Sequence, residues 1–162
     1  MEDFGSGALR RLIETHASAL RGTHANLGDA TAVVDAARII DVMRFLRDDG
    51  ECQFDMLTDL TAVDYLGEEP RFEVVYHLYS VPKNKRLRVK ARLCEKALEI
   101  ATLCELWPSA NWMEREVWDL YGIRFAGHPD LRRILLYEEF EGHPLRKDYP
   151  KEKRQPLVGP RN

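Results

Sequence analysis

The sequence predicts an α+β fold, in which N-terminal helices pack on a mostly antiparallel mixed sheet, followed by a short C-terminal helix and then an extended C-terminal arm. Two observations carry this prediction. Apolar residues near the N-terminus recur with the 3.6-residue period of a helix, whereas over residues 52–93 they alternate with the two-residue period of a strand. Helices that precede such a strand-rich middle are typical of an arrangement with the helices on one sheet face.

The N-terminal part predicts an amphipathic helix, a strand and a second helix. The first helix has one face of residues at i, i+3, i+4, i+7 and i+11. These residues are Leu9, Leu12, Ile13, His16 and Leu20. A short buried strand is expected at 31–35, with the sequence TAVVD, and a second helix at 36–47, which ends near Gly50.

Residues 52–93 predict an antiparallel meander. Its strands are expected at 52–65, 71–80 and 86–93, with turns at 68–70 and 82–85 between them. The alternation leaves at least one face of this meander half-solvated.

The same alternation assigns individual side chains to faces. Phe54 and Met56 are expected on one face of the first strand. His77 falls on the more polar face of its strand, so we interpret it as a surface histidine rather than a ligand.

A further helix is predicted over residues 112–121. Asn111 is a suitable N-cap, and Gly122 is suited to the left-handed position that ends a helix. Arg115 and Asp119 are spaced i, i+4 on the polar side, where they can pair. The apolar stripe contains Met113, Val117, Leu120 and Tyr121.

Glu114 allows three interpretations. It stands three residues after Asn111, which is the spacing of a capping box. A buried pairing with Arg132 or Arg133 would also explain it. A catalytic pair with Glu116 is disfavoured, because residues i and i+2 diverge on a helix.

Composition excludes several classes of protein. The chain has 162 residues, which suits one domain, and a net charge of −3, which gives no general attraction to nucleic acid. Its apolar runs are too short to span a bilayer, and its acidic start does not match a signal peptide, so cytoplasmic residence is expected. Cys52, Cys94 and Cys104 form no CxxC pair and are too few for the four ligands of an iron–sulfur cluster.

The C-terminal part is basic. From Gly142 to Asn162 there are six basic and two acidic residues, so the rest of the chain carries the negative charge. A basic tail on an acidic body suggests a partner surface.

The motif Gly-His-Pro occurs twice, at 127–129 and 142–144. A metal site is conceivable here, but the spacing lacks the rigid i, i+4 placement of a helical ligand pair. Its ligands would be His128, Asp130, His143 and Asp148.

A phosphate site is also conceivable, because arginine matches phosphate oxygens, but no glycine-rich nest accompanies it. Its residues would be Arg132, Arg133, Arg146 and Lys147. The remaining interpretation is recognition, since Pro129 and Pro144 each push the preceding histidine toward extended geometry.

The chain after Asp148 has too few apolar residues to fold alone. It is expected either as an extended arm that another subunit orders or as a solvated tail. We therefore divide the chain into an α+β domain over residues 1–125 and a docking arm rich in Pro, Arg and Lys over residues 126–162.

Two long sequence segments resemble a known protein family. NWMEREVWDLYGIRFAGHPDLRRIL at 111–135 and EGHPLRKDYP at 141–150 resemble the signature of the C subunit of respiratory NADH-quinone oxidoreductase (complex I), the 30 kDa subunit family. The segments FDMLTDLTAVDY and RFEVVYHLYS also resemble the middle strands of that family. The resemblance covers roughly residues 31–150.

The resemblance implies that this chain has no catalytic, cofactor-binding or metal-binding residues of its own. FMN, iron–sulfur clusters and quinone would be bound by partner subunits. The signature residues would then be folding and docking elements: Glu114, Arg115, Glu116, Asp119, Gly122, Gly127, His128, Pro129, Asp130, Arg132, Arg133, Gly142, His143, Pro144, Leu145, Arg146, Lys147 and Asp148.

As a function, the resemblance implies a peripheral-arm subunit of a proton-translocating NADH:quinone oxidoreductase. It would dock chiefly on the D subunit of that complex and also near the B subunit, on the cytoplasmic side of the bacterial inner membrane, and would contact the membrane only through the complex. An equivalent scaffold role in a membrane-bound hydrogenase or a complex fed by another donor is the alternative. A free-standing anion-binding or hydrolytic domain is the hypothesis from a different class.

Overall fold

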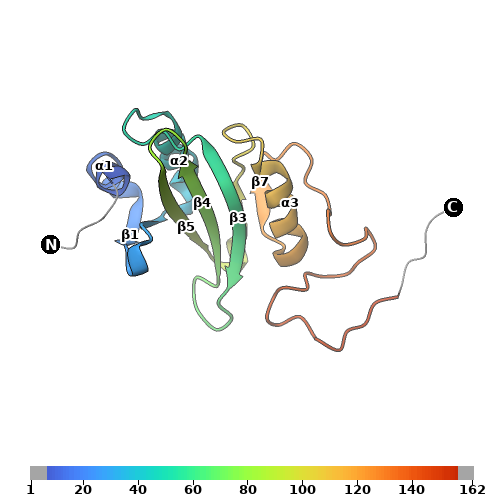
Figure 1. Cartoon of the computed structure of the whole chain (residues 1–162). Coiled ribbons are helices and arrows are strands. Elements are labelled where there is room, and N and C mark those ends of the chain that lie inside the picture. The colour runs from blue at the N-terminus through green and yellow to red at the C-terminus, as the bar shows by residue number, and fades with distance from the viewer. Residues whose placement is uncertain (1–6, 157–162) are drawn as a thin grey trace.

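The computed structural model describes residues 7–156 of the chain and contains a five-stranded main sheet (Figure 1). The spatial order is β1-β2-β5-β4-β3. Only β2 and β5 run parallel; the other neighbours are antiparallel, which confirms the predicted mostly antiparallel mixed sheet. The strands are β1 (Leu20–His24), β2 (Thr31–Val34), β3 (Met56–Asp64), β4 (Phe72–Ser80) and β5 (Lys85–Leu93).

Three helices and a second small sheet complete the domain. The helices are α1 (Gly7–His16), α2 (Ile39–Asp48) and α3 (Ala110–Tyr121). The parallel strands β6 (Glu99–Ala101) and β7 (Arg124–Ala126) form the second sheet. Figure 1 shows α3 and β7 next to β3, at the edge of the main sheet away from β1.

The predicted apolar face of the main sheet is the core. Val74, Tyr76 and Leu78 of β4 are buried, as expected from the alternation. They belong to one cluster with Met43 of α2 and Val117 of α3. Each fully buried side chain of this size contributes about 1.5–3 kcal/mol to folding, so this face provides most of the driving force.

The opposite face of β5 carries only basic side chains. Three of these four cations pair with a carboxylate at about the same distance. The pairs are Arg88–Asp29 at 3.0 Å, Lys90–Glu73 at 2.9 Å and Arg92–Glu68 at 3.1 Å, and the fourth cation is Arg86. We call Arg86, Arg88, Lys90 and Arg92 the cationic row.

The first predicted helix is too long, and β1 was not predicted. The helix ends at His16, and Leu20 instead begins β1, where it pairs with Val34 of β2. An apolar residue at position 20 satisfies both periods. Pairing with a distant strand decides between them, and a local pattern does not contain that information.

The predicted shared face of Phe54 and Met56 is wrong. Phe54 is fully buried but precedes β3, whereas the side chain of Met56 is 46% exposed. Residues 53–55 are not part of a strand: Gln53 has φ of 50° and the N–H of Asp55 bonds to the carbonyl of Gln53, so the two-residue alternation does not hold between Phe54 and Met56.

Beyond β7 the described chain forms no helix or strand up to residue 156. Figure 1 shows this segment following α3 before it leaves the domain. Within residues 7–156 there is no helix with the length and apolar character needed to cross a membrane.

Gly122 tests how closely this segment approaches α3. It takes the left-handed conformation predicted for it, with φ of 75°, and an added Cβ would lie 2.6 Å from atoms of His143 and Arg146. We expect Gly122→Ala to lower the free energy of unfolding by about 2–4 kcal/mol, because conformational strain and overpacking add. The measurement is urea unfolding.

Gly28→Ala is the matched control. Gly28 has φ of 85°, but nothing lies within 4 Å of an added Cβ. It should therefore lose only the conformational part, about 1–2 kcal/mol. Equal losses for the two variants would contradict a close approach at Gly122.

Candidate functional site

The predicted signature residues gather around α3 and the chain that follows β7. That chain returns along the helix and binds it through side chains and backbone groups (Figure 1). We call the contacts made by Arg115, Asp119, Arg133, His143 and Arg146 the α3 clamp.

Asp119 is the buried centre of the α3 clamp. Its fully buried carboxylate accepts hydrogen bonds from the backbone N–H groups of Ile134, Leu135 and Leu136 at 3.1, 2.9 and 2.9 Å. It also accepts one from Arg133 Nη1 at 2.6 Å. Burial opposes ionisation, but these donors outweigh it, so the pKa of Asp119 is lowered. An ionised carboxylate therefore fixes three consecutive peptide groups.

Two arginines extend this fixation to the carbonyl groups of the returning chain. Arg133 Nη2 donates to the carbonyls of Phe140 and Gly142 at 2.7 and 3.3 Å. Arg115 donates to the carbonyls of Arg132 and Arg133 at 3.1 and 2.9 Å. The guanidinium groups thus satisfy backbone acceptors that lack secondary structure.

The predicted pairing of Arg115 with Asp119 is wrong. Asp119 is buried and forms its ion pair with Arg133. The side of α3 expected to face solvent is covered by the returning chain, so tertiary contacts replace the local i, i+4 pair.

The second Gly-His-Pro motif and the two residues after it cap the C-terminus of α3. The last four carbonyls of a helix have no partner within it. Here each one accepts a hydrogen bond. The carbonyl of Trp118 accepts from Gly122 N at 2.8 Å, and that of Asp119 accepts from His143 Nδ1 at 2.9 Å. The carbonyl of Leu120 accepts from Leu145 N at 3.1 Å, and that of Tyr121 accepts from Arg146 Nε at 2.6 Å. His143 donates from Nδ1, and burial lowers its pKa, in keeping with a neutral ring.

The following residues are attached to the domain through Arg71. This buried arginine pairs with Asp64 at 2.9 Å, Asp148 at 2.9 Å and Glu95 at 2.8 Å. The backbone N–H of Lys147 donates to Asp64 at 2.8 Å. Hydrogen bonds from Arg71 lower the pKa values of Asp64 and Asp148. The predicted arm is therefore bound to its own domain as far as Asp148.

In the first Gly-His-Pro motif, the histidine ring is held by backbone groups. His128 Nε2 donates to the carbonyl of Asn111 at 3.0 Å, and its Nδ1 accepts the N–H of Asp130 at 3.0 Å. Gly127 has φ of 84°, which a glycine adopts without strain. Asp130 also pairs with Arg132 at 2.9 Å on the surface.

Neither the capping box nor a buried arginine pair explains Glu114. The N-cap is Ser109, whose side chain makes no capping bond, and Asn111 lies inside α3. The fully buried Glu114 carboxyl instead accepts from Leu103 N at 2.7 Å and bonds with Thr102 Oγ1 at 2.5 Å. Burial raises the pKa of Glu114, although these two hydrogen bonds act in the opposite direction.

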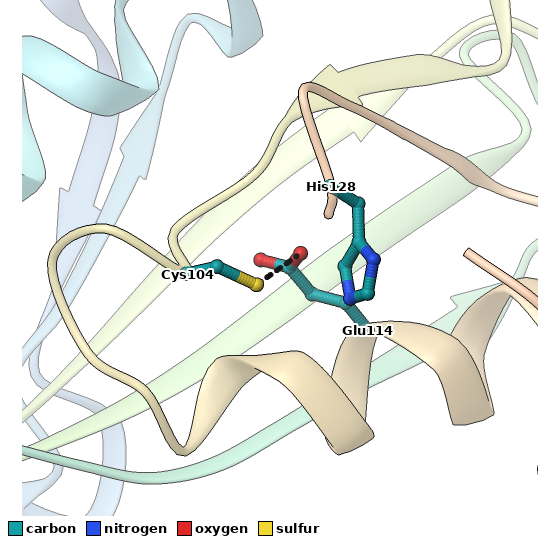
Figure 2. A group of neighbouring side chains, drawn as sticks. All are labelled: Cys104, Glu114 and His128. Atoms are coloured by element: carbon teal, nitrogen blue, oxygen red, sulfur yellow. Dashed lines mark hydrogen bonds between the residues drawn. The ribbon is translucent and has the colours of Figure 1, made fainter. Parts of the chain in front are cut away.

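Figure 2 shows Glu114 with Cys104 and His128, whose ligand atoms lie within 4.8 Å of one another. Cysteine, carboxylate and histidine are zinc ligands. However, His128 already donates from Nε2 and accepts at Nδ1, so no ring lone pair is free. Cys104 donates to Glu114 at 3.5 Å, and burial raises the pKa of this thiol to about 11. The group is arranged as a hydrogen-bonded cluster rather than as a metal site.

Several signature residues face outward instead. Glu116, Pro129, Leu145 and Lys147 have exposed side chains. They are available to a partner, and the docking role assigned to them remains a prediction.

The sequence interpretation missed Asp64, Arg71, Glu95 and Thr102. A signal for one pair did exist, since Asp64 and Arg71 flank the turn between two predicted antiparallel strands. Asp64 pairs with Phe72 across these strands, so the side chain of the adjacent Arg71 is within reach of it. Glu95 begins a short 3-10 helix (Glu95–Ala97) and Thr102 directly follows β6, and neither position has any such pattern.

The comparison with known families agrees with the resemblance that the signature segments carry. Residues 32–155 match the family described as the respiratory-chain NADH dehydrogenase 30 kDa subunit. The C subunit of NADH-quinone oxidoreductase from Geotalea uraniireducens (strain Rf4) is 46% identical over 154 residues, which cover 94% of this chain and 93% of that protein. The C subunit from Roseiflexus castenholzii (strain DSM 13941 / HLO8) is 51% identical, covering 88% of this chain and 82% of that protein.

Solved structures show the same fold. The trypsin-resistant fragment (1–134) of Nqo5 superposes with a TM-score of 0.68 at 36% identity and covers 76% of this chain and 99% of that one. A chain of the membrane-bound sulfane sulfur reductase, an archaeal respiratory membrane complex, gives a TM-score of 0.75 at 25% identity, covering 89% of this chain and 84% of that one. This chain belongs to the respiratory-chain NADH dehydrogenase 30 kDa subunit family, which confirms the resemblance.

Asp119→Ala tests the α3 clamp. The change leaves Arg133 and three backbone N–H groups without their acceptor, so we expect a loss of about 3–5 kcal/mol in the free energy of unfolding. Glu116→Ala, at an exposed position of the same helix, should change it by less than about 0.5 kcal/mol. Denaturant unfolding measures both. A small loss for Asp119→Ala would show that the returning chain is held by other contacts.

Glu114→Gln tests the protonation of the buried carboxyl. Since the folded-state pKa is raised above 4.5, the favourable contribution of the neutral group is complete below pH 4.5 and is lost as pH rises through the folded pKa. Glutamine removes this dependence. We therefore expect the stability of the variant relative to wild type to be higher at pH 7 than at pH 4, as measured by urea unfolding at both values. A pH-independent difference would contradict a raised pKa, and Glu116→Gln is the control.

Proposed function

We propose that this chain is a non-catalytic subunit of the quinone module of a proton-translocating NADH:quinone oxidoreductase, where it docks on the D subunit in the peripheral arm. The family match over residues 32–155 carries the proposal. In this role the chain supports electron transfer from NADH to quinone by holding neighbouring subunits in place.

The contacts of the signature residues favour a structural role. Asp119, Arg115, His143 and Arg146 all bind backbone groups of the same chain. A side chain that binds backbone groups in this way fixes the path of the chain, which is a structural role. FMN, iron–sulfur clusters and quinone are accordingly assigned to partner subunits.

The outward-facing part of the same region supports docking. Leu135 and Leu145 lie on the chain that the α3 clamp fixes, with exposed fractions of 62% and 49%. A preordered surface loses less conformational entropy on binding than a loose tail.

A second candidate is the equivalent subunit of a complex fed by another electron donor. The superposition with the sulfane sulfur reductase chain favours it, because a related fold serves there in a different respiratory complex. The two candidates share the scaffold role and differ in the partner subunits.

Tagged purification from membranes in mild detergent, followed by mass spectrometry, tests the proposal. Recovery of NADH-binding and quinone-module subunits is the expected result. Recovery of sulfur reductase or hydrogenase subunits would favour the second candidate. Purification of the chain alone, from membranes shown to contain the intact complex, would contradict both.

Complementation tests the non-catalytic role. In a strain that lacks the chain, we expect Glu114→Gln to restore NADH:quinone oxidoreductase activity in membranes to within about twofold of wild type. The conservative change keeps the hydrogen-bonding shape, and no proton transfer is assigned to this carboxyl. Normal assembly combined with lost activity would instead assign chemistry to Glu114.

A further inference from the structure

Trp112 lies in the first turn of α3 with most of its side chain in solvent. Its exposed fraction is 70%, and it is not a member of the core cluster. In the described part of the chain, the indole forms no hydrogen bond and no contact with another ring or a cation. Tryptophan is also a weaker helix former than alanine, so neither packing nor local propensity explains this residue. The fold of the isolated chain gives no reason for an indole at this position.

Glu116 stands one turn after Trp112 on the same face of α3. Side chains four residues apart are neighbours on a helix surface, with about 5–6 Å between their Cβ atoms. Glu116 is exposed, and over residues 7–156 its carboxylate accepts no hydrogen bond and forms no ion pair. An aromatic ring and a free carboxylate therefore lie side by side on the solvent side of the helix.

The nearby arginines of the chain are bound to other groups. Arg115 points to another side of α3, since consecutive residues diverge by about 100° on a helix, and it donates to the carbonyls of Arg132 and Arg133. These two arginines have carboxylates of their own: the pairs are Arg132–Asp130 at 2.9 Å and Arg133–Asp119 at 2.6 Å. The carboxylate of Glu116 is thus left for a cation from outside the chain.

Trp112 and Glu116 continue the exposed surface that the α3 clamp fixes. Asp119 follows Glu116 by three residues, and its carboxylate accepts the backbone N–H of Leu135 at 2.9 Å. The side chain of Leu135 is 62% exposed. The carboxylate of Glu116 therefore lies between an indole and an exposed leucine, along about 10 Å of α3. A central polar contact, surrounded by apolar groups that exclude water, is the arrangement of an interface hot spot.

An arginine side chain fits this pair better than a lysine. Its flat guanidinium group stacks on an indole face, and its forked N–H groups match the two oxygens of a carboxylate. A lysine ammonium can pair with the carboxylate but has no plane to lay on the ring. We propose that Trp112 and Glu116 together bind an arginine of a neighbouring protein subunit, with Leu135 at the border of the contact. The inference rests on the proposed function and names the chemistry of the partner at the docking surface.

Photo-cross-linking from position 112 of the tagged chain identifies the partner in the intact complex. A photoreactive phenylalanine keeps an aromatic ring at this position. The expected result is a cross-link to one partner subunit, in a peptide that has an arginine next to the linked residue. A cross-link to lipid or to a second copy of this chain, a linked peptide without arginine, or no cross-link would overturn the proposal.

Competition between wild-type and variant chains measures the contribution of each group. In cells that produce both chains in equal amounts, their ratio in the purified complex reports their relative affinity. Trp112→Leu keeps an apolar side chain but removes the ring, and Glu116→Gln keeps the shape but removes the charge. We expect wild type to exceed each variant by about fivefold or more. Glu51→Gln, at an exposed position in the turn after α2, is the control and should compete equally. Equal competition by Trp112→Leu or Glu116→Gln would overturn the proposal.

Urea unfolding of the isolated chains separates binding from folding. Trp112→Leu and Glu116→Gln should unfold at the wild-type midpoint, because both side chains are exposed. A lower midpoint for either variant would give that residue a role in the fold and would overturn the proposal.

Charge reversal tests the arginine itself. Glu116→Arg should exclude the chain from the complex, because two cations would then face each other. Changing the arginine of the cross-linked peptide to glutamate should restore its incorporation. Absence of this restoration would overturn a contact between an arginine and the carboxylate.

The outcomes also separate this inference from the proposed function. Wild-type chain that purifies with the expected subunits, combined with no cross-link from position 112 to an arginine-containing peptide, would overturn the arginine contact alone. Wild-type chain that purifies with no other subunit would overturn both.

Discussion

The buried carboxylate of Asp119 is the interaction on which the C-terminal half of the structure depends. It joins α3 to a stretch of chain that has no helix or strand of its own, by accepting three consecutive backbone N–H groups and one arginine. Buried N–H groups need an acceptor, and an irregular segment cannot supply one from a neighbouring strand. A single ionised side chain therefore replaces secondary structure as the organiser of this segment.

The same logic holds further along that segment. His143 and Arg146 satisfy carbonyls at the end of α3, and Arg71 gathers Asp64 and Asp148. Buried ion pairs add little net stability compared with apolar residues of similar size, but breaking one is costly. We infer that these contacts select one path for the chain rather than maximise stability, which is what a surface shared with fixed neighbours requires.

The sequence predicted what depends on local periodicity. The alternation in β5 and the existence of α2 were correct, because burial of one face imposes the period directly. In β4 the expected apolar face is buried, but Glu73 and Val75 on the other face are buried as well. The sequence prediction failed where distant residues decide. Leu20 joins a strand through pairing with β2, and Asp119 is buried because chain from fifteen residues further on covers it. The two signature segments identified the family, but the spacing of their residues alone did not reveal that the side chains satisfy the C-terminus of α3 and bind the returning chain to it.

The α3 clamp orders this segment without a partner. Amide hydrogen exchange of the isolated chain tests it directly at Ile134, Leu135 and Leu136, whose N–H groups bond to Asp119. We expect these three amides to exchange far more slowly than in an unfolded peptide of the same sequence. Exchange at the unfolded rate would show that the segment is ordered only by its partners, and would contradict the role assigned to Asp119.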